Sequence, residues 1–189
     1  MANALDITKP IPDYVAGTWD IDPVHSDVSF TVRHMMVSKV RGNFKSFSGQ
    51  IITAENPLAS SVTAEVDLGS IDTGNIDRDN HLRSADFFES DANPKMTFRS
   101  TGIKASGDDF ILDGELTIKG ITRSLPLQVE VNGLGPDAYG GTRVGFSATG
   151  EINRKDFGVN FNATMETGGV VVADRVNLHL EIEAVLKTA

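Results

Sequence analysis

Apolar and polar residues alternate along most of this chain. From Asp27 to Val32, for example, every second residue is apolar and the residues between are polar. A period of two is typical of a strand with one buried face and one solvated face. Six stretches alternate clearly and two more do so weakly, and together they predict eight strands, over residues 27–32, 44–53, 62–68, 95–103, 110–119, 125–131, 144–152 and 176–183.

The alternation also predicts how these strands are arranged. Parallel sheets are covered by helices on both faces and their strands read as continuous apolar runs, so strands with one polar face indicate an antiparallel sheet. Several predicted strands run about ten residues, longer than the usual five or six, and this length favours a closed barrel over a sandwich. A barrel of eight strands is wide enough either to be filled by side chains or to hold one slender ligand. The strand pattern does not decide between a barrel filled by side chains and a barrel that holds a ligand.

One stretch breaks the alternation. The residues RDNHLRSADFF, at positions 78–88, lie in a segment that predicts an amphipathic helix of two to three turns over residues 77–89. Asp77 or Asp79 can cap this helix, and Asp79 stands four residues before Arg83, the spacing of a helical ion pair. We expect the segment to lie across one end of the barrel as a lid or plug, with contact residues Arg78, His81, Leu82, Phe87 and Phe88.

Charge and composition narrow the choice of partners. The net charge of −9 and a pI of about 4.8 disfavour binding to nucleic acid, because phosphate backbones would be repelled. No stretch approaches the roughly 18 apolar residues of a membrane span, and the N-terminus lacks the basic start and apolar run of an export signal. We therefore expect a cytoplasmic protein without stable membrane insertion. Residues 1–13 predict an N-terminal tail and residues 14–189 a single domain; a homodimer is compatible with this sequence.

Residues able to carry chemistry are scarce. The chain has no cysteine, and its four histidines, His25, His34, His81 and His179, show no spacing of common metal sites. Asp79, His81 and Asp86 are explained as charges on a solvated helix, and Ser84 lacks the flanking glycines of a nucleophile elbow. We expect no catalytic residue, no metal and no required cofactor.

Several longer motifs together resemble a known family. WDIDPVHSDVSFTVRHMMVSKVRGNF near the start, SIDTGNIDRDNHLRSADFF in the middle and NRKDFG late in the chain occur in this order, and LTIKGITRSLPLQV and DRVNLHLEIEAV also resemble strands of the YceI-like family. The resemblance spans residues 14–186. It implies a lipocalin-like, extended barrel whose apolar lumen binds a long polyisoprenoid, such as an isoprenoid quinone or polyprenyl lipid. It also implies storage, transport or sensing of that lipid rather than catalysis; many members are periplasmic.

The resemblance turns the apolar strand positions into candidate lipid contacts. His34 has the sequence parity of Val28, Phe30 and Val32, so it is the candidate for meeting a lipid head group. Arg154 and Lys155 form a basic pair that either meets an anionic head group or lies in an exposed turn. The expected lipid-binding residues are Val28, Phe30, Val32, His34, Met36, Phe44, Phe98, Phe110, Leu112, Leu116, Ile118, Phe146, Leu178 and Leu180.

Two other functions stay open at this point. An enzyme acting on an apolar substrate in the lumen would need an ionisable residue inside the barrel, and His34 is the obvious one. A barrel packed solid with side chains would instead be an interaction module without a ligand.

Overall fold

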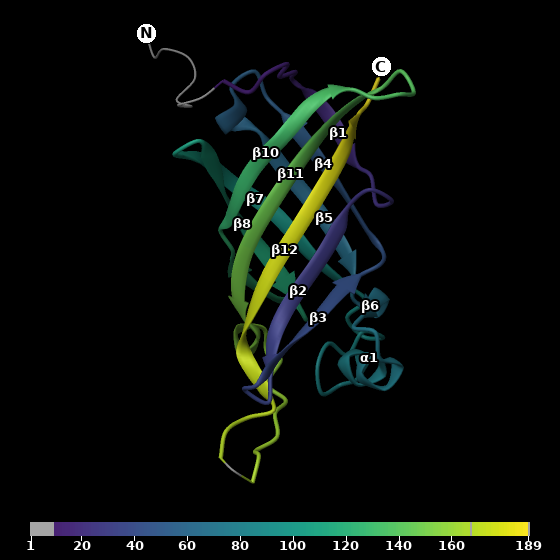
Figure 1. Cartoon of the computed structure of the whole chain (residues 1–189), viewed down its shortest axis with the longest axis vertical. Helices are drawn as coiled ribbons and strands as arrows, with labels where there is room; N and C mark the ends of the chain where they lie inside the picture. The colour runs from purple at the N-terminus through teal and green to yellow at the C-terminus, as the bar shows by residue number, and fades with distance from the viewer. Residues whose placement is uncertain (1–9, 167, 189) are drawn as a thin grey trace.

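Twelve strands, three short 3-10 turns and one α-helix make up the part of the chain that the computed structural model describes, residues 10–166 and 168–188. The strands wind into a tall barrel, with the end of β12 at the upper end and α1 at the lower end (Figure 1). In chain order the elements are β1 (Gly17–Ile21), β2 (Asp27–His34), β3 (Ser38–Phe44), β4 (Phe47–Thr53), η1 (Pro57–Ala59), β5 (Ser61–Asp67), η2 (Leu68–Ser70), β6 (Ile71–Asp72), α1 (Ile76–Arg83), β7 (Lys95–Ser106), β8 (Asp109–Ile118), β9 (Ile121–Ser124), β10 (Leu127–Pro136), β11 (Thr142–Asn153), η3 (Arg154–Phe157) and β12 (Val172–Leu186).

Hydrogen bonding closes the sheet into a ring. β12 pairs with β11 along one edge, and along its other edge it pairs first with β2 and then with β1. β1 and β2 therefore lie end to end in one barrel position, and β3 and β4, which pair with them, fill the next. With β5, β7, β8, β10, β11 and β12 the ring has eight positions, all antiparallel. The predicted all-β, eight-stranded antiparallel barrel with one short helical segment is confirmed.

Two of the eight barrel positions differ from the prediction, because each is formed by two strands instead of one. The alternation pattern marked the strands that became β2 and β4 but missed β1 and β3, which complete them. β1 is only five residues long. In β3 the residue between Val40 and Phe44 in the inward row is Gly42, which carries no apolar signal. A period-two pattern is weakest where a strand is short or where glycine replaces an inward side chain.

The helical segment is shorter than the sequence predicted. α1 spans eight residues and ends at Arg83; its C-cap is Ser84, whose backbone N–H and hydroxyl both donate to the carbonyl of His81. Its N-cap is Asn75, whose side chain accepts from the N–H of Arg78, so neither Asp77 nor Asp79 caps it. Residues 84–94 continue as turns, and the chain then enters β7. Among the described residues no helix is long and apolar enough to cross a membrane.

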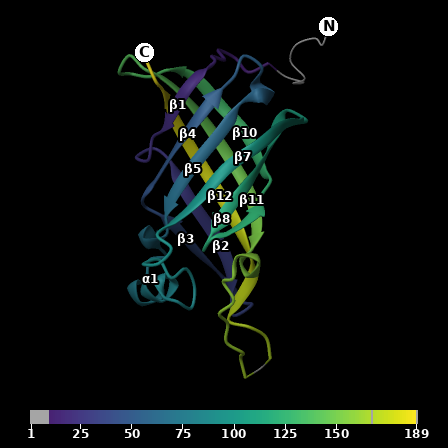
Figure 2. The same cartoon turned by 180° about the vertical axis from the view of Figure 1, so that it is seen from behind.

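The two ends of the barrel are covered by different segments. At the lower end lie α1, the turns after it and the long connection between β11 and β12 (Figure 2). At the upper end the indole of Trp19, fully buried, packs with Ile51, Val144 and Ala184 and donates to Thr53 Oγ1 at 2.8 Å. Of the tail predicted over residues 1–13, residues 1–9 lie outside the described residues.

Arg143 ties three elements together near the upper end. Its guanidinium donates to Asp22 at 2.7 Å, to Asp137 at 2.9 Å and to Glu183 at 3.0 Å. The hydrogen bond from Arg143, followed by that from His25, holds the pKa of the Asp22 carboxyl well below its ordinary value near 3.8. Backbone N–H groups of Gly141 and Tyr139, followed by Arg143, also lower the pKa of Asp137. The cluster links the β1–β2 loop to the β10–β11 hairpin and to β12.

We expect Arg143→Met to lower the melting temperature at neutral pH and to lose this effect in acid. A carboxylate with a depressed folded-state pKa stabilises the fold above its unfolded pKa, and this contribution disappears as pH falls towards the folded value. The difference in melting temperature between the wild type and the variant should be constant from about pH 5 to pH 8 and shrink below about pH 4. Thermal unfolding followed by circular dichroism measures it. Lys187→Met, which removes an exposed ion pair with Asp20, is the control; a pH-independent difference for Arg143→Met would contradict the prediction.

Candidate functional site

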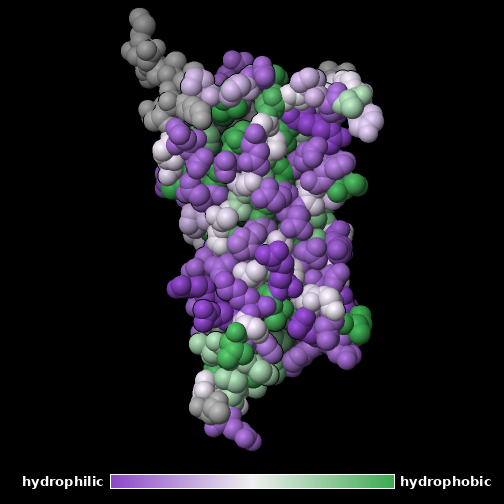
Figure 3. Space-filling model, in the orientation of Figure 1, coloured by the Kyte–Doolittle hydropathy of each residue, from purple (hydrophilic) through white to green (hydrophobic). Residues whose placement is uncertain are grey.

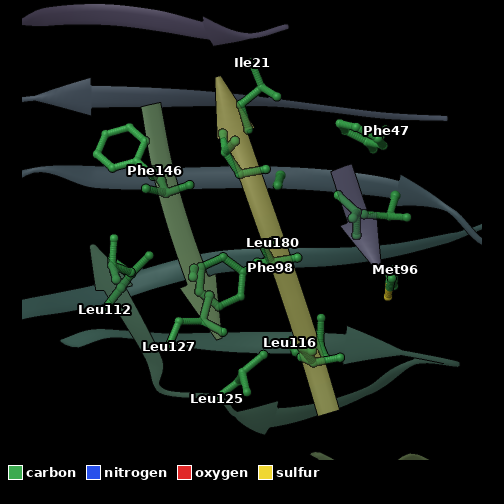
Figure 4. Close-up of a pocket in the computed structure, with 18 of the residues that line it drawn as sticks. Ile21, Phe47, Met96, Phe98, Leu112, Leu116, Leu125, Leu127, Phe146 and Leu180 are labelled. Carbon is green, nitrogen blue, oxygen red and sulfur yellow. The ribbon is translucent and has the colours of Figure 1, made fainter. Parts of the chain in front are cut away.

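A cavity of about 330 Å³ runs inside the barrel, and its wall is almost entirely apolar. The wall consists of the inward side chains of the strands; in β12, for example, Leu178, Leu180 and Ile182 line the cavity while His179 and Glu181 are exposed outside. Figure 4 shows such residues converging from strands on opposite sides of the barrel, among them Ile21, Phe98, Leu112, Leu127, Phe146 and Leu180. The interior is therefore hollow rather than packed solid.

Inward glycines help to keep this interior hollow. Gly114 on β8 lies beside the ring of Phe98 on β7, and a Cβ at this position would stand only 2.2 Å from Phe98 Cζ. Gly42 on β3 and Phe30 on β2 are arranged in the same way, with 2.5 Å from the built Cβ to the Phe30 ring. Each ring thus occupies the place of a missing side chain on the next strand. An aromatic ring that lies along the wall leaves the centre of the barrel open.

The buried polar side-chain atoms on the cavity wall are already paired in the described part of the chain. The hydroxyl of Tyr14 donates to the carbonyl of Ala54, and the hydroxyl of Thr53 donates to the carbonyl of Val15 at 2.8 Å. Within the described residues every fully buried side-chain nitrogen and oxygen has a hydrogen-bond partner. The cavity therefore offers a ligand shape and apolar contact, because it presents no unpaired buried donor.

Two chain segments close the lower end of the cavity. Leu82, Phe87 and Phe88 come from α1 and the turns after it, and Phe157 and Val159 come from η3 and the chain that follows. The two segments meet where Phe161 contacts the rings of His81 and Phe87, at centroid distances of 4.8 and 5.2 Å. His81 also contacts Asp86, with 2.8 Å between Nε2 and Oδ2.

Hydrogen bonds fasten the helical segment to the chain that precedes it. Arg83 donates to the carbonyls of Gly69 at 2.8 Å and Ile71 at 3.0 Å, and no ion pair joins it to Asp79 in the described chain. Asp79 is buried and instead accepts from the backbone and hydroxyl of Thr73, to which Arg78 also donates. The prediction of a helical ion pair is thus wrong: these charged side chains bond to η2, β6 and Thr73, the segment that precedes the helix and lies beside it.

The connection after β11 is held by one buried arginine. Arg154 is 5% exposed, and its guanidinium donates to the carbonyls of Val159, Phe161, Val172 and Ala173 at 2.8 to 3.2 Å. Burial lowers the pKa of Arg154, and Asp174, whose carboxylate lies 3.8 Å away, opposes that shift. The sequence offered an exposed turn or a head-group contact for Arg154 and Lys155. Of the two, only Lys155 is exposed, and the hydrogen bonds of Arg154 go to backbone carbonyls of the protein.

Most of the residues expected to contact lipid lie on the cavity wall. Lipid contact itself stays a prediction for each of them. The twelve that line the cavity are Val28, Phe30, Val32, Phe44, Phe98, Phe110, Leu112, Leu116, Ile118, Phe146, Leu178 and Leu180.

His34 and Met36 are not on the cavity wall. His34 is the last residue of β2, and on this strand the cavity wall reaches only as far as Val32. Met36 lies in the turn to β3 with a positive φ of 61° and is 52% exposed. The sequence parity fails for Met36 because the strand has ended, and it fails for His34 because the cavity wall on β2 stops before the strand does.

The sequence did not identify several residues that shape the cavity. Ile11 and Tyr14 line it although they precede the first strand, and Phe157 and Val159 close it from a segment without alternation. Their apolar character was visible, but no strand or helix pattern placed them. Among the described residues no three histidine or acidic side chains are grouped as metal ligands would be.

Comparisons with known proteins agree with this architecture. The UPF0312 protein of Staphylococcus epidermidis is 44% identical over 167 residues, which cover 87% of this chain and 95% of that protein. The crystal structure of BcnA from Burkholderia cenocepacia is 27% identical with a TM-score of 0.75, covering 86% of this chain and 98% of the other. A polyisoprenoid binding domain from Saccharophagus degradans, implicated in plant cell wall breakdown, is 18% identical with a TM-score of 0.69, covering 92% and 100%, a likeness of fold alone.

The family relationship extends over nearly the whole barrel. The sequence matches the YceI-like domain over residues 19–184, from β1 to β12. This chain therefore belongs to the YceI-like family.

Proposed function

We propose that this protein binds one long-chain polyisoprenoid lipid, such as an isoprenoid quinone or a polyprenyl lipid, in its cavity and leaves the lipid chemically unchanged. The observation that carries the proposal is the apolar cavity of about 330 Å³. This volume lies within the range of roughly 300–1,000 Å³ typical of small-molecule sites. A hydrocarbon chain matches a wall that offers carbon almost everywhere.

The size of the cavity supports an occupant. An unfilled apolar cavity costs roughly 24 cal/mol per Å³ in core mutants, so a void of about 330 Å³ would correspond to on the order of 8 kcal/mol. Whole domains are stable by only about 5–15 kcal/mol. A bound lipid offsets this cost, because each methylene removed from water contributes about 0.8 kcal/mol.

The shape of the barrel favours a long and narrow ligand. Ten residues of strand rise about 33 Å, and strands in barrels tilt by roughly 35–45°, which leaves an axial length of about 25 Å. A polyisoprenoid is a flexible chain of this kind, and it gains contact along its whole length. The solved domain from Saccharophagus degradans, named for polyisoprenoid binding, has the same fold and is consistent with this proposal.

We propose binding without catalysis because of the side chains on the cavity wall. The ionisable side chains among the described lining residues are Tyr14 and Arg154. The hydroxyl of Tyr14 and the guanidinium of Arg154 are engaged with backbone carbonyls. A general acid or base must reach the reacting group, and His34, the residue that an enzyme would have used, is not on the wall.

Mass spectrometry of an organic extract from the purified protein tests the proposal. We expect a lipid whose fragments repeat in isoprene units, bound at about one molecule per chain. Protein stripped of lipid and then incubated with a polyprenol should regain that stoichiometry in native mass spectrometry. No isoprenoid in the extract and no reloading would overturn the proposal, and conversion of the added lipid into a new compound would identify an enzyme instead. The cytoplasmic location expected from the sequence stays a prediction for cell fractionation.

A further inference from the structure

The lower tip of the barrel carries an exposed apolar patch outside the cavity. The turn between β2 and β3 presents Met35, Met36 and Val37, which are 43%, 52% and 86% exposed. Val170, 37% exposed, joins them from the connection before β12, and the N–H of Met35 donates to the neighbouring carbonyl of Val171 at 2.8 Å. Figure 3 shows apolar surface gathered at this end of the molecule. We call Met35, Met36, Val37 and Val170 the tip patch.

The turn that forms the tip patch has an unusual sequence for its geometry. Met35 and Met36 have φ angles of 51° and 61°, and the N–H of Val37 donates to the carbonyl of His34 at 3.2 Å. Two successive residues with positive φ are typical of a type I′ hairpin turn, for which Asn-Gly is strongly preferred. Methionine is unfavourable in this backbone conformation. A local rule of folding is therefore broken where the side chains contribute little to the core, which is typical of a functional position.

Basic residues lie on the two strands that lead into and out of the turn of the tip patch. Arg33, Lys39 and Arg41 are exposed on β2 and β3, and none of them makes an ion pair within the described residues. The nearby acids Glu151 and Asp174 are paired with Arg175 and Lys155, at 2.9 and 3.2 Å. We call Arg33, Lys39 and Arg41 the basic collar. A further acid is the exposed Glu166, which lies with Val170 in the connection between β11 and β12.

The basic collar stands out against the rest of the chain. Between residues 28 and 54 there are four lysines or arginines and no acidic residue, although the whole chain has 26 acids and a net charge of −9. An anionic surface would repel most of this molecule and attract the segment that bears the tip patch. The charge distribution therefore selects one orientation, with the tip towards the surface.

We propose that the tip patch and the basic collar dock this protein on the surface of an anionic phospholipid bilayer. Apolar side chains that enter the boundary between head groups and acyl chains, next to cations that face the head groups, are the combination that binds proteins to such surfaces. A second copy of the chain is the less favourable occupant, because joining two tips would bring two basic collars together. The docked tip adjoins the cavity, since Val172, which pairs with His34, lies on the cavity wall.

Vesicle flotation tests the docking surface. The full-length protein should float with vesicles of equal parts phosphatidylglycerol and phosphatidylcholine, and much less with pure phosphatidylcholine. Raising the salt concentration should weaken the binding, because the attraction is between exposed charges. The variant R33Q/K39Q/R41Q should bind the anionic vesicles about a hundredfold more weakly, at about fivefold per charge. The control R99Q/K104Q/R123Q removes the same charge from exposed positions outside the collar and should bind like the wild type.

A second variant separates docking from folding. M35N/M36G introduces the preferred residues of the turn, so its melting temperature should equal or exceed that of the wild type. Its binding to the anionic vesicles should fall by about tenfold or more, because the apolar side chains are gone. Val24→Asn replaces a valine that is 82% exposed in the β1–β2 loop and should leave binding unchanged.

The outcomes of these measurements are distinct. Absence of vesicle binding, equal binding to neutral and anionic vesicles, or unchanged binding of M35N/M36G would each overturn the proposal. A dimer in light scattering that M35N/M36G dissociates, without vesicle binding, would assign the patch to a second copy and overturn it as well. Lipid binding in the cavity is tested by extraction and is independent of these results.

Discussion

Replacing Arg154 by methionine is expected to lower the free energy of unfolding by about 3–5 kcal/mol. The guanidinium donates to four backbone carbonyls, and removing one partner of a buried charged network typically costs that much, because the remaining polar groups lose their bonds. Methionine keeps the length of the side chain and its apolar contacts. The expected loss therefore reflects the hydrogen bonds rather than a cavity.

Urea unfolding measures this effect, as a lower midpoint with an unchanged slope. Lys155→Met is the matched control: the neighbouring lysine is exposed and makes an ion pair with Asp174, which is worth about 0–1 kcal/mol. Arg154→Lys should recover only part of the loss, because an ammonium group cannot reach carbonyls on both sides of the connection in a fixed fork. A loss for Arg154→Met as small as that of the control would show that the connection between β11 and β12 is held by its apolar residues.

Filling the cavity is expected to abolish lipid binding. Ala64 on β5 and Ala148 on β11 line the cavity wall, and each alanine leaves room in front of it. The double variant Ala64→Phe/Ala148→Phe would place two rings in the void that the proposed lipid occupies. We expect at least a tenfold drop in isoprenoid recovered per chain. The fold should survive, because overpacking typically costs about 1–3 kcal/mol and here the void accepts the rings.

The outward neighbours of the same two alanines provide the control. Thr63 and Thr149 are exposed on the outer face of β5 and β11, so Thr63→Phe/Thr149→Phe adds the same rings outside the barrel. Mass spectrometry of organic extracts gives the lipid content of both variants, and circular dichroism reports whether they are folded. A folded Ala64→Phe/Ala148→Phe protein that retains the full lipid content would mean that the lipid lies elsewhere.

The strand pattern of this protein could be derived from its sequence because a strand alternates its faces with a fixed period. Phe110, Leu112 and Leu116 were assigned to the interior of β8 on that ground, and all three line the cavity. The assignment failed for Met36 because a period says nothing about where a strand stops, and for His34 because a period says nothing about where along a strand the cavity ends. It also missed β1 and β3, where the alternating signal is short or interrupted by glycine.

The sequence by itself determined the side-chain faces of the long strands, the antiparallel barrel and the presence of a short helix within residues 77–89, since these depend on local periodicity; the cap and the end of that helix were not determined. Only the tertiary structure decided that the barrel is hollow. The void depends on contacts between strands, such as the ring of Phe98 lying beside Gly114, and on β12 bridging β1 and β2 to close the ring. The burial of Arg154 was decided in the same way, because its carbonyl partners come from residues up to 19 positions away along the chain.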